Sequence, residues 1–287
     1  MKALVRTGII ILLILGLCST SSEANQKMHS LCELHYPSDY LLESKCVEVT
    51  SDGSPSRIFG KYWKDGLRFN RMDRRHFIAG LWIKVPRHLR DLRGFNPMPE
   101  FYPDAEQEPQ FILVDQNEMF LGAYEYGRLV FSSAVAVGIE GYRLRNGSYQ
   151  VDAVDAHHES SLYRMEGSDR YYPMHYGLRF YTDKRPDGWS TYWFHGRDVP
   201  GYPASHGCIG LYDEEMQKEY YKEPARPVLM DAKRLYQWVV GGNPDDGKFE
   251  NVHNGPKVLI MGDPPTVAEH SPGLVIVPAS GKPGQRP

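Results

Sequence analysis

The chain has 287 residues, with 33 lysines and arginines against 36 aspartates and glutamates, and a formal net charge of −3 at pH 7. This near balance gives no support for nucleic-acid binding, which depends on a clear excess of positive charge. The length suits one large or two modest domains, and an aromatic content of 12% favours strands.

The first 24 residues have the pattern of an export signal. Lys2 and Arg6 give a basic start, the apolar run Gly8–Leu17 follows, and small residues end at Ala24. That run is shorter than the roughly 20 apolar residues of a membrane span. We therefore predict a signal peptide over 1–24 and an exported protein of the periplasm or cell envelope, with no transmembrane helix in the mature chain. An uncleaved N-terminal anchor is the alternative.

Export decides what the cysteines mean. Removal of the signal takes away Cys18 and leaves Cys32, Cys46 and Cys208. Cys32 and Cys46 are close in sequence, so we expect them to form a disulfide in an oxidising compartment. Such a bond would stabilise the fold by roughly 3 kcal/mol in the chain-entropy model. Cys208 is then left over, as an intermolecular link, an inert buried residue or a reactive group.

Residues 25–86 are predicted to form a small module in the order strand, helix, helix, strand. Ser54 and Pro55 have the residue types of a helix N-cap and a first helical position. The four elements are expected at 45–49, from 55 onward, at 64–70 and at 81–85.

The end of this module resembles a LysM domain. The resemblance rests on Phe69-Asn70-Arg71-Met72 and on the stretch Gly80–Pro86. It implies binding to the N-acetylglucosamine-containing glycan of peptidoglycan. The opening turn Ser51–Pro55 departs from the glycine-aspartate-threonine turn common in LysM units, and a module that serves only as a spacer is the alternative.

Residues 87–109 contain four prolines without an apolar period and are predicted to be a linker. In 110–262, short strands and turns without crossover helices favour a mainly β domain, an antiparallel sandwich or barrel with a few helices. Expected strands lie at 111–115, 118–125, 128–135 and 148–154, and expected helices at 213–221 and 231–240.

Local signals add detail to this β domain. Asn146 and Gly147 form a strong hairpin signal. Asp231 is expected to cap the start of the second helix, and Gly241 to end it. The tail 263–287, rich in proline and glycine, is predicted to be disordered.

The stretch 192–212 holds the reactive side chains. A predicted strand carries His195 to its end, a loop with glycine and prolines follows, and Ser205-His206-Gly207-Cys208 completes it. Cysteine is easily made nucleophilic near neutral pH, and a charged imidazole lowers its pKa from about 8.5 to roughly 3.5–7.5. Glycines at 207 and 210 let backbone N–H groups face an oxyanion. We infer that Cys208 attacks a carbonyl carbon.

Other interpretations remain open at this point. Cys208 is also compatible with an inert core position, or with zinc ligation together with His195 and His206. A second histidine group is expected at the surface or beside the substrate. It consists of His157, His158 and His175. Tyr202 and Tyr212 flank the loop and are expected to line the substrate cleft.

The pattern His195-Gly196, a spacer, and Ser205–Cys208 resembles the L,D-transpeptidase catalytic domain (YkuD type). The stretches 111–115 and 120–125 resemble that domain's opening hairpin. The resemblance implies that Cys208 is the nucleophile, that His195 accepts and donates the proton, and that Ser205 orients this imidazole. It also implies an oxyanion hole from the backbone of His206, Gly207 and Cys208.

The same resemblance implies a substrate. Peptidoglycan tetrapeptide stems would form a thioester on Cys208 and then a 3→3 cross-link, or a bond to another amine acceptor, with no cofactor and no metal. Gly210 stands where the family usually has arginine or asparagine, and Arg197 is expected to replace that charge in substrate binding. An L,D-carboxypeptidase, a hydrolase of a wall-attached protein and a non-catalytic peptidoglycan-binding protein are the alternatives.

Overall fold

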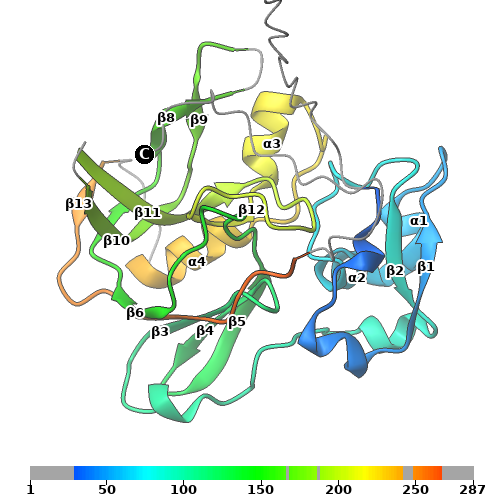
Figure 1. Ribbon diagram of the computed structural model, residues 1–287, viewed down its shortest axis with the longest axis horizontal. Helices are drawn as coiled ribbons and strands as arrows, with labels where there is room; N and C mark the ends of the chain where they lie inside the picture. The colour runs from blue at the N-terminus through cyan, green and yellow to red at the C-terminus, as the bar shows by residue number, and fades with distance from the viewer. Residues whose placement is uncertain (1–28, 166–167, 186–187, 242–247, 267–287) are drawn as a thin grey trace, which may run out of the picture.

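A computed structural model of the chain describes residues 29–165, 168–185, 188–241 and 248–266 (Figure 1). The predicted signal peptide, and the predicted disordered tail from residue 267 on, lie outside these ranges. In the part of the chain that is described, no helix is long and apolar enough to cross a membrane.

The N-terminal unit, residues 29–86, is built on a two-stranded antiparallel sheet. The sheet consists of β1 (Ser44–Glu48) and β2 (Trp82–Pro86). Along the chain, helices α1 (Pro55–Phe59) and α2 (Trp63–Phe69) lie between these two strands. Ser54 caps α1 by accepting a hydrogen bond from the Arg57 N–H, as its sequence predicts. Three short 3-10 helices, η1 (Leu31–Glu33), η2 (Pro37–Leu41) and η3 (Gly60–Tyr62), complete the unit. The order of strands and helices is the predicted one, whereas the assignment to the LysM family stays a prediction.

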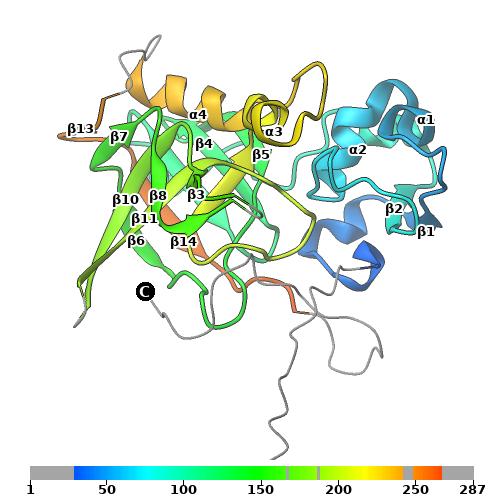
Figure 2. The same ribbon diagram turned by 90° about the horizontal axis from the view of Figure 1, so that it is seen from above.

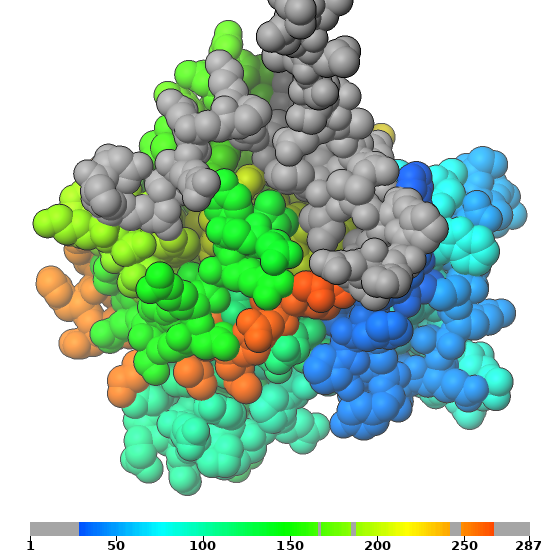
Figure 3. Space-filling model, viewed as in Figure 1, coloured from blue at the N-terminus to red at the C-terminus, as the bar shows by residue number. Residues whose placement is uncertain are grey.

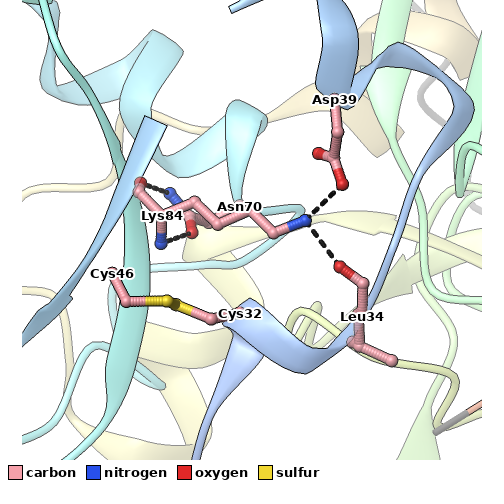
Figure 4. The surroundings of a disulfide bond; sticks show 6 residues. All are labelled: Cys32, Leu34, Asp39, Cys46, Asn70 and Lys84. Atoms are coloured by element: carbon pink, nitrogen blue, oxygen red, sulfur yellow. Dashed lines mark hydrogen bonds and ion pairs between the residues drawn. A yellow bond between two sulfur atoms is a disulfide. The ribbon is translucent and has the colours of Figure 1, made fainter. Parts of the chain in front are cut away.

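A disulfide between Cys32 and Cys46 joins the first 3-10 helix to β1 (Figure 4). Beside it, the Lys84 ammonium donates to the Leu34 carbonyl at 2.5 Å and to Asp39 Oδ2 at 2.6 Å. The Asn70 amide makes two hydrogen bonds with the backbone of Lys84, at 2.8 and 2.9 Å. Burial lowers the pKa of Lys84. These contacts tie the start of the described chain to the small sheet.

Two five-stranded sheets form the larger part of the molecule. The first has the order β5-β4-β3-β14-β6 and the second the order β12-β11-β10-β7-β13. The first consists of β3 (Phe111–Asp115), β4 (Phe120–Glu125), β5 (Arg128–Ala134), β6 (Gly147–Gln150) and β14 (Lys257–Met261). The second consists of β7 (Ala153–Asp155), β10 (Gly177–Arg185), β11 (Gly188–Arg197), β12 (Ile209–Tyr212) and β13 (Glu250–Asn251).

Smaller elements surround these sheets. Strands β8 (Glu159–Arg164) and β9 (Tyr171–Pro173) form a separate antiparallel pair. Helices α3 (Glu214–Tyr221) and α4 (Asp231–Val240) lie along one side of the sheets, where α4 packs on β11 and β12 (Figure 2).

The β architecture corrects two expectations. The sheets are mixed, because β3 pairs with β14 and β11 with β12 in parallel, and the described strands do not close into a barrel. The hairpin at Asn146 and Gly147 was wrong, since β6 pairs with β14 at the opposite edge of the sheet from β5. The expected strand 148–154 is divided between β6 and β7, which lie in different sheets. Local turn signals carry no information on pairing between segments so distant in sequence.

The helix ends follow the sequence in part. Gly241 ends α4 with a left-handed backbone, as predicted. Asp213, which was expected to be the first residue of its helix, instead caps α3 by accepting from the Met216 N–H. The capping role of Asp231 was wrong, because Met230 occupies the N-cap without a side-chain bond. The Asp231 carboxylate instead accepts hydrogen bonds from Arg68 and Ser133.

Residues 87–109 are packed rather than extended. They form the 3-10 helices η4 (Leu89–Leu92) and η5 (Pro103–Ala105) and bury Leu92, Phe95, Met98 and Ala105. The Phe95 ring lies 5.1 Å from that of Phe69 in α2 and 6.1 Å from that of Phe120 in β4. The core therefore runs without interruption from the N-terminal unit into the sheets. In the space-filling view, the blue N-terminal residues and the orange residues near 260 lie against each other on one face of the molecule (Figure 3).

Candidate active site

The parallel pairing of β11 with β12 brings together the two ends of residues 192–212, the reactive segment. Phe194 lies opposite Ile209, and His195 lies opposite Gly210. Cys208 immediately precedes β12. The backbone of Trp193, in β11, hydrogen-bonds to its thiol group. The strand that carries His195 (β11, the histidine strand) and residues Ser205–Cys208 (the cysteine loop) are thus neighbours, as expected.

His195 is held as a neutral base. Its side chain is buried, and Nδ1 lies 2.8 Å from the carbonyl oxygen of Gly196. A carbonyl oxygen only accepts, so Nδ1 carries the proton and Nε2 keeps its lone pair. Burial lowers the pKa of His195 to about 3, and the nearby charge of Arg197 acts in the same direction. The resting imidazole is therefore neutral at pH 7, and its Nε2 carries no proton.

Cys208 is held as a neutral thiol. Burial raises its pKa to about 11, against the opposing influence of the Trp193 backbone and of Arg197. With His195 also neutral, no thiolate–imidazolium pair is present at rest. This differs from the pKa lowering expected from the sequence, and the reason is desolvation of both groups, although the Cys208 side chain keeps some accessible surface. Attack by the sulfur must then be accompanied by transfer of its proton.

Ser205 organises the cysteine loop. Its buried hydroxyl donates to the carbonyl oxygen of Cys208 at 2.5 Å and accepts from the Gly207 N–H at 3.0 Å. The single hydroxyl proton is thus used inside the loop, and the carbonyl of Gly196 orients His195 in its place. Because the Gly207 N–H is also occupied, the N–H groups of His206 and Cys208 are the remaining candidates for an oxyanion hole.

Gly207 allows the loop to close. Its φ of 116° lies in a region that side chains rarely adopt, and a Cβ there would stand 2.6 Å from the Tyr192 ring. His206, one residue earlier, packs between two aromatic rings. Its centroid lies 4.5 Å from that of Tyr142 and 4.7 Å from that of Tyr163. Burial and Arg197 together lower the pKa of His206 to about 4.

Arg197 occupies the space beside Gly210. A Cβ on Gly210 would overlap with Cγ and Cδ of Arg197. The guanidinium donates to the carbonyl oxygens of Asp198 at 3.1 Å and Ala204 at 3.0 Å. No carboxylate within the described residues forms an ion pair with it. Its charge nevertheless acts on the pKa values of the site, lowering those of Cys208, His195 and His206.

The two tyrosines expected in the cleft have different environments. Tyr212 in β12 is fully buried and belongs to the hydrophobic core, so its predicted role in lining a cleft was wrong. Tyr202 is partly buried and packs against the same core, and burial raises its pKa. Of the pair, only Tyr202 keeps an accessible surface beside the loop.

Two histidines of the second group lie closer to the site than the sequence indicated. The His158 ring stacks on Trp193 with centroids 4.0 Å apart, and its Nδ1 lies 3.1 Å from Asp155. The backbone carbonyl of His175 accepts from the Gly196 N–H at 2.8 Å. Both histidines contribute to the low pKa of His195. Strand pairing brings them there, and no local motif could have revealed it.

Asp213 supports the strand from the other side. It is fully buried, and burial raises its pKa to about 6. Its Oδ2 lies 3.7 Å from His175 Nδ1, and a Cβ on Gly196 would overlap with the Asp213 carboxylate. The glycine of the His-Gly pair therefore makes room for this acid, a role that no local sequence signal indicates.

Comparison with known proteins decides the family. The model of the L,D-transpeptidase catalytic domain (YkuD) matches residues 109–260, more than half of the chain. The chain belongs to this family. The match covers the two large sheets, the histidine strand and the cysteine loop, and it ends within β14. A search of curated proteins found no match.

Solved L,D-transpeptidase structures are similar to part of the chain. That from Stackebrandtia nassauensis is 19% identical, covers 55% of this chain and 58% of its own, and has a TM-score of 0.35. That from Xylanimonas cellulosilytica is 20% identical, covers 69% and 79%, and has a TM-score of 0.38. A mutant L,D-transpeptidase from Enterococcus faecium is 17% identical, covers 54% and 50%, and has a TM-score of 0.33. The chain thus spans little more than half the length of the first of these.

Proposed function

We propose that this L,D-transpeptidase family member cross-links peptidoglycan tetrapeptide stems through a thioester on Cys208. The observation that carries the proposal is the neutral, buried His195 on the strand beside the cysteine loop, with Nδ1 bonded to Gly196 and Nε2 free to accept. Family membership supports the same chemistry.

In the first step, the sulfur of Cys208 attacks the carbonyl carbon of the diamino acid at stem position three. His195 Nε2 takes the thiol proton as the carbon–sulfur bond forms, which avoids a separate buried thiolate. The N–H groups of His206 and Cys208 stabilise the oxyanion, and one such donor contributes roughly 3–4 kcal/mol. The imidazolium then protonates the departing amine, and terminal D-alanine leaves.

In the second step, an amine from a neighbouring stem attacks the thioester. His195 accepts a proton from this amine, and the same proton returns to the sulfur as the carbon–sulfur bond breaks. The products are a new amide, a 3→3 cross-link, and the free thiol of Cys208. Two acyl transfers thereby replace one direct amide exchange.

Arg197 supplies the positive charge for substrate binding. Peptide stems carry carboxylates, and a guanidinium without a carboxylate partner is suited to bind one. Its position beside Gly210 and its influence on the pKa values of Cys208 and His195 support this role. Tyr202 contributes the accessible aromatic surface beside the loop.

The protein acts in the periplasm or cell envelope, and its N-terminal unit binds glycan. The disulfide Cys32–Cys46 supports an oxidising compartment. The strand-helix-helix-strand order supports a LysM-like unit, as does its tail from Phe69 to Pro86. Retention of the whole mature chain on insoluble peptidoglycan tests the glycan binding, with Cys208→Ala as the non-reacting form. If the chain is not retained, the N-terminal unit serves only as a spacer.

Mass spectrometry of purified muropeptides tests the catalytic proposal. Incubation with tetrapeptide stems should give 3→3 dimers with loss of D-alanine, and Cys208→Ala should give none. A carbapenem should add its mass to Cys208. Tripeptides without dimers would instead identify an L,D-carboxypeptidase. An unmodified Cys208 and unchanged stems would indicate a non-catalytic peptidoglycan-binding protein.

A further inference from the structure

A turn of the N-terminal unit lies against the chain between the histidine strand and the cysteine loop. The Asp73 N–H donates to the Val199 carbonyl at 2.7 Å, and the Val199 N–H donates to Asp73 Oδ2 at 2.8 Å. Met72 forms a β-bridge with Pro200. Figures 1 and 2 both show the yellow-green connection between β11 and β12 reaching toward this unit. Residues 198–201, the connecting segment, are therefore held by a different part of the chain.

The far end of the connecting segment is fixed as well. The hydroxyl of Tyr36 donates to the Gly201 carbonyl at 3.1 Å. Gly201 has a φ of 96°, and a Cβ there would stand 2.7 Å from Leu31 and 3.1 Å from the Asn70 carbonyl. This close approach leaves the segment little room to move.

Asp198, at the near end, is held by charge. Arg75 donates to both of its carboxylate oxygens, at 3.2 and 2.9 Å. Gln217 donates to Asp73 at 2.8 Å and to Asp198 at 3.0 Å, and the Tyr221 hydroxyl donates to Asp198 at 3.1 Å. Asp73 is fully buried and Asp198 is 8% exposed. Such bonds are strong and directional because the acceptors are charged and the surroundings exclude water.

The donor set of this cluster favours an ion-pair network over a metal site. Ligand atoms of Asp73, His76 and Asp198 lie within 4.8 Å of one another, which is close enough for a cation. Their oxygens, however, already accept from Arg75, Gln217 and Val199, and the guanidinium supplies the positive charge. The cluster is therefore complete as a structural junction.

We propose that the N-terminal unit is a positioning part of the active centre, in which Asp73 and Arg75 hold the connecting segment and thereby the placement of Arg197 and the cysteine loop. The proposal rests on the proposed function, because Cys208 is the reacting group. The connecting segment begins directly after Arg197, and the loop residue Ala204 accepts from that arginine. A misplacement of about 1 Å in a reacting group is enough to cost roughly 100-fold in rate.

Asp73→Ala in the full chain tests the proposal. It removes the acceptor for the Val199 N–H, and Asp73→Asn restores an oxygen acceptor of the same shape. We expect the maximal rate of Cys208 acylation by a carbapenem to fall at least tenfold in Asp73→Ala and to recover in large part in Asp73→Asn. The carbapenem concentration for half-maximal rate should change less than the maximal rate does.

Two further variants keep the test decisive. Glu43→Ala breaks an exposed ion pair between Glu43 of the N-terminal unit and Arg87, neither of which contacts the connecting segment, and should leave the rate unchanged. Tyr36→Phe removes only the hydroxyl that reaches Gly201, and it serves if Asp73→Ala fails to fold. A folded Asp73→Ala or Tyr36→Phe protein that reacts at the wild-type rate would overturn the proposal.

Alkylation of Cys208 by iodoacetamide separates this proposal from the proposed function. The rate reports the surroundings of the thiol and needs no peptidoglycan substrate. If the wild-type chain makes no cross-links but Asp73→Ala still changes the alkylation rate at least tenfold, the positioning role stands and the enzymatic proposal fails. Equal alkylation rates in both proteins would argue against the positioning role alone.

Discussion

The side chain of Arg197 lies where a side chain at position 210 would stand. Gly210 has no Cβ, and any Cβ placed there would overlap with the stem of the arginine. The positive charge beside the cysteine loop is therefore carried on β11, next to a position of β12 that has no side chain. Because β11 and β12 are parallel and in fixed register, both positions face the same side of the sheet.

Gly210→Arg should displace Arg197 and reduce activity at least tenfold, chiefly by raising KM. The double variant Gly210→Arg with Arg197→Gly moves the charge to position 210 and removes the overlap, so we expect it to recover much of the loss. Steady-state kinetics on purified tetrapeptide stems measure both effects. A double variant no better than Gly210→Arg would contradict an exchange of position between the two residues.

The pH dependence of acylation should be broad. The pKa of His195 is about 3 and that of Cys208 about 11, so both groups stay neutral between these values. As pH falls toward 3, His195 becomes protonated and loses its ability to accept, and the rate declines. We expect a nearly flat rate of carbapenem acylation from about pH 5 to 9.

Arg197→Gln is the matching variant for this profile. Loss of its charge raises the pKa of His195, because the cation disfavours the imidazolium. The decline in rate on the acid side should therefore begin at a higher pH than in the wild-type protein. An acid limb that stays in place would show that Arg197 does not act on the imidazole.

Ser205→Ala should destabilise the protein and slow the reaction together. It leaves the N–H of Gly207 without its acceptor in a buried loop, which costs about 1–3 kcal/mol in the free energy of unfolding. Denaturant unfolding measures the first effect, and alkylation of Cys208 the second. Ser56→Ala, at an exposed serine of α1, is the control and should change neither.

Arg71→Met should destabilise the fold by about 3–5 kcal/mol. Arg71 is fully buried and bonds Glu118 at 2.8 Å, so its loss leaves a buried carboxylate without a counter-charge. Burial already raises the pKa of Glu118. In the variant, stability should therefore rise as pH falls and Glu118 takes up a proton, and adding Glu118→Gln should recover much of the loss at neutral pH. Denaturant unfolding at pH 5 and pH 8 checks both.

Local chemistry made part of this molecule predictable. Ser54 and Gly241 mark helix ends through their own side chain or backbone, and the sequence is sufficient to read them. The reactive segment was also recognisable, since Cys208 and its histidines are few and close together. These features depend on neighbours within a few residues.

Features that depend on distant pairing were missed or misjudged. The surroundings of the fully buried Tyr212 depend on the parallel pairing of β12 with β11. The His158 ring follows β7 and stacks on Trp193 of β11, two strands that are far apart in sequence. The apolar residues of 87–109 follow no period, so their burial in the core could not be foreseen. Ser205 was assigned to the wrong partner because only the folded loop shows where its proton goes.

The arginines of the N-terminal unit determine how the two parts of this protein relate. Four of them each form an ion pair with a carboxylate of residues 110–262. The pairs are Arg68–Asp231, Arg71–Glu118, Arg74–Glu214 and Arg75–Asp198. Three of the four carboxylates are less than 8% exposed on their side chains. A unit taken from another protein would leave these acids buried without their counter-charges. The two parts are therefore not interchangeable modules, and substitutions on one side of the junction constrain those on the other.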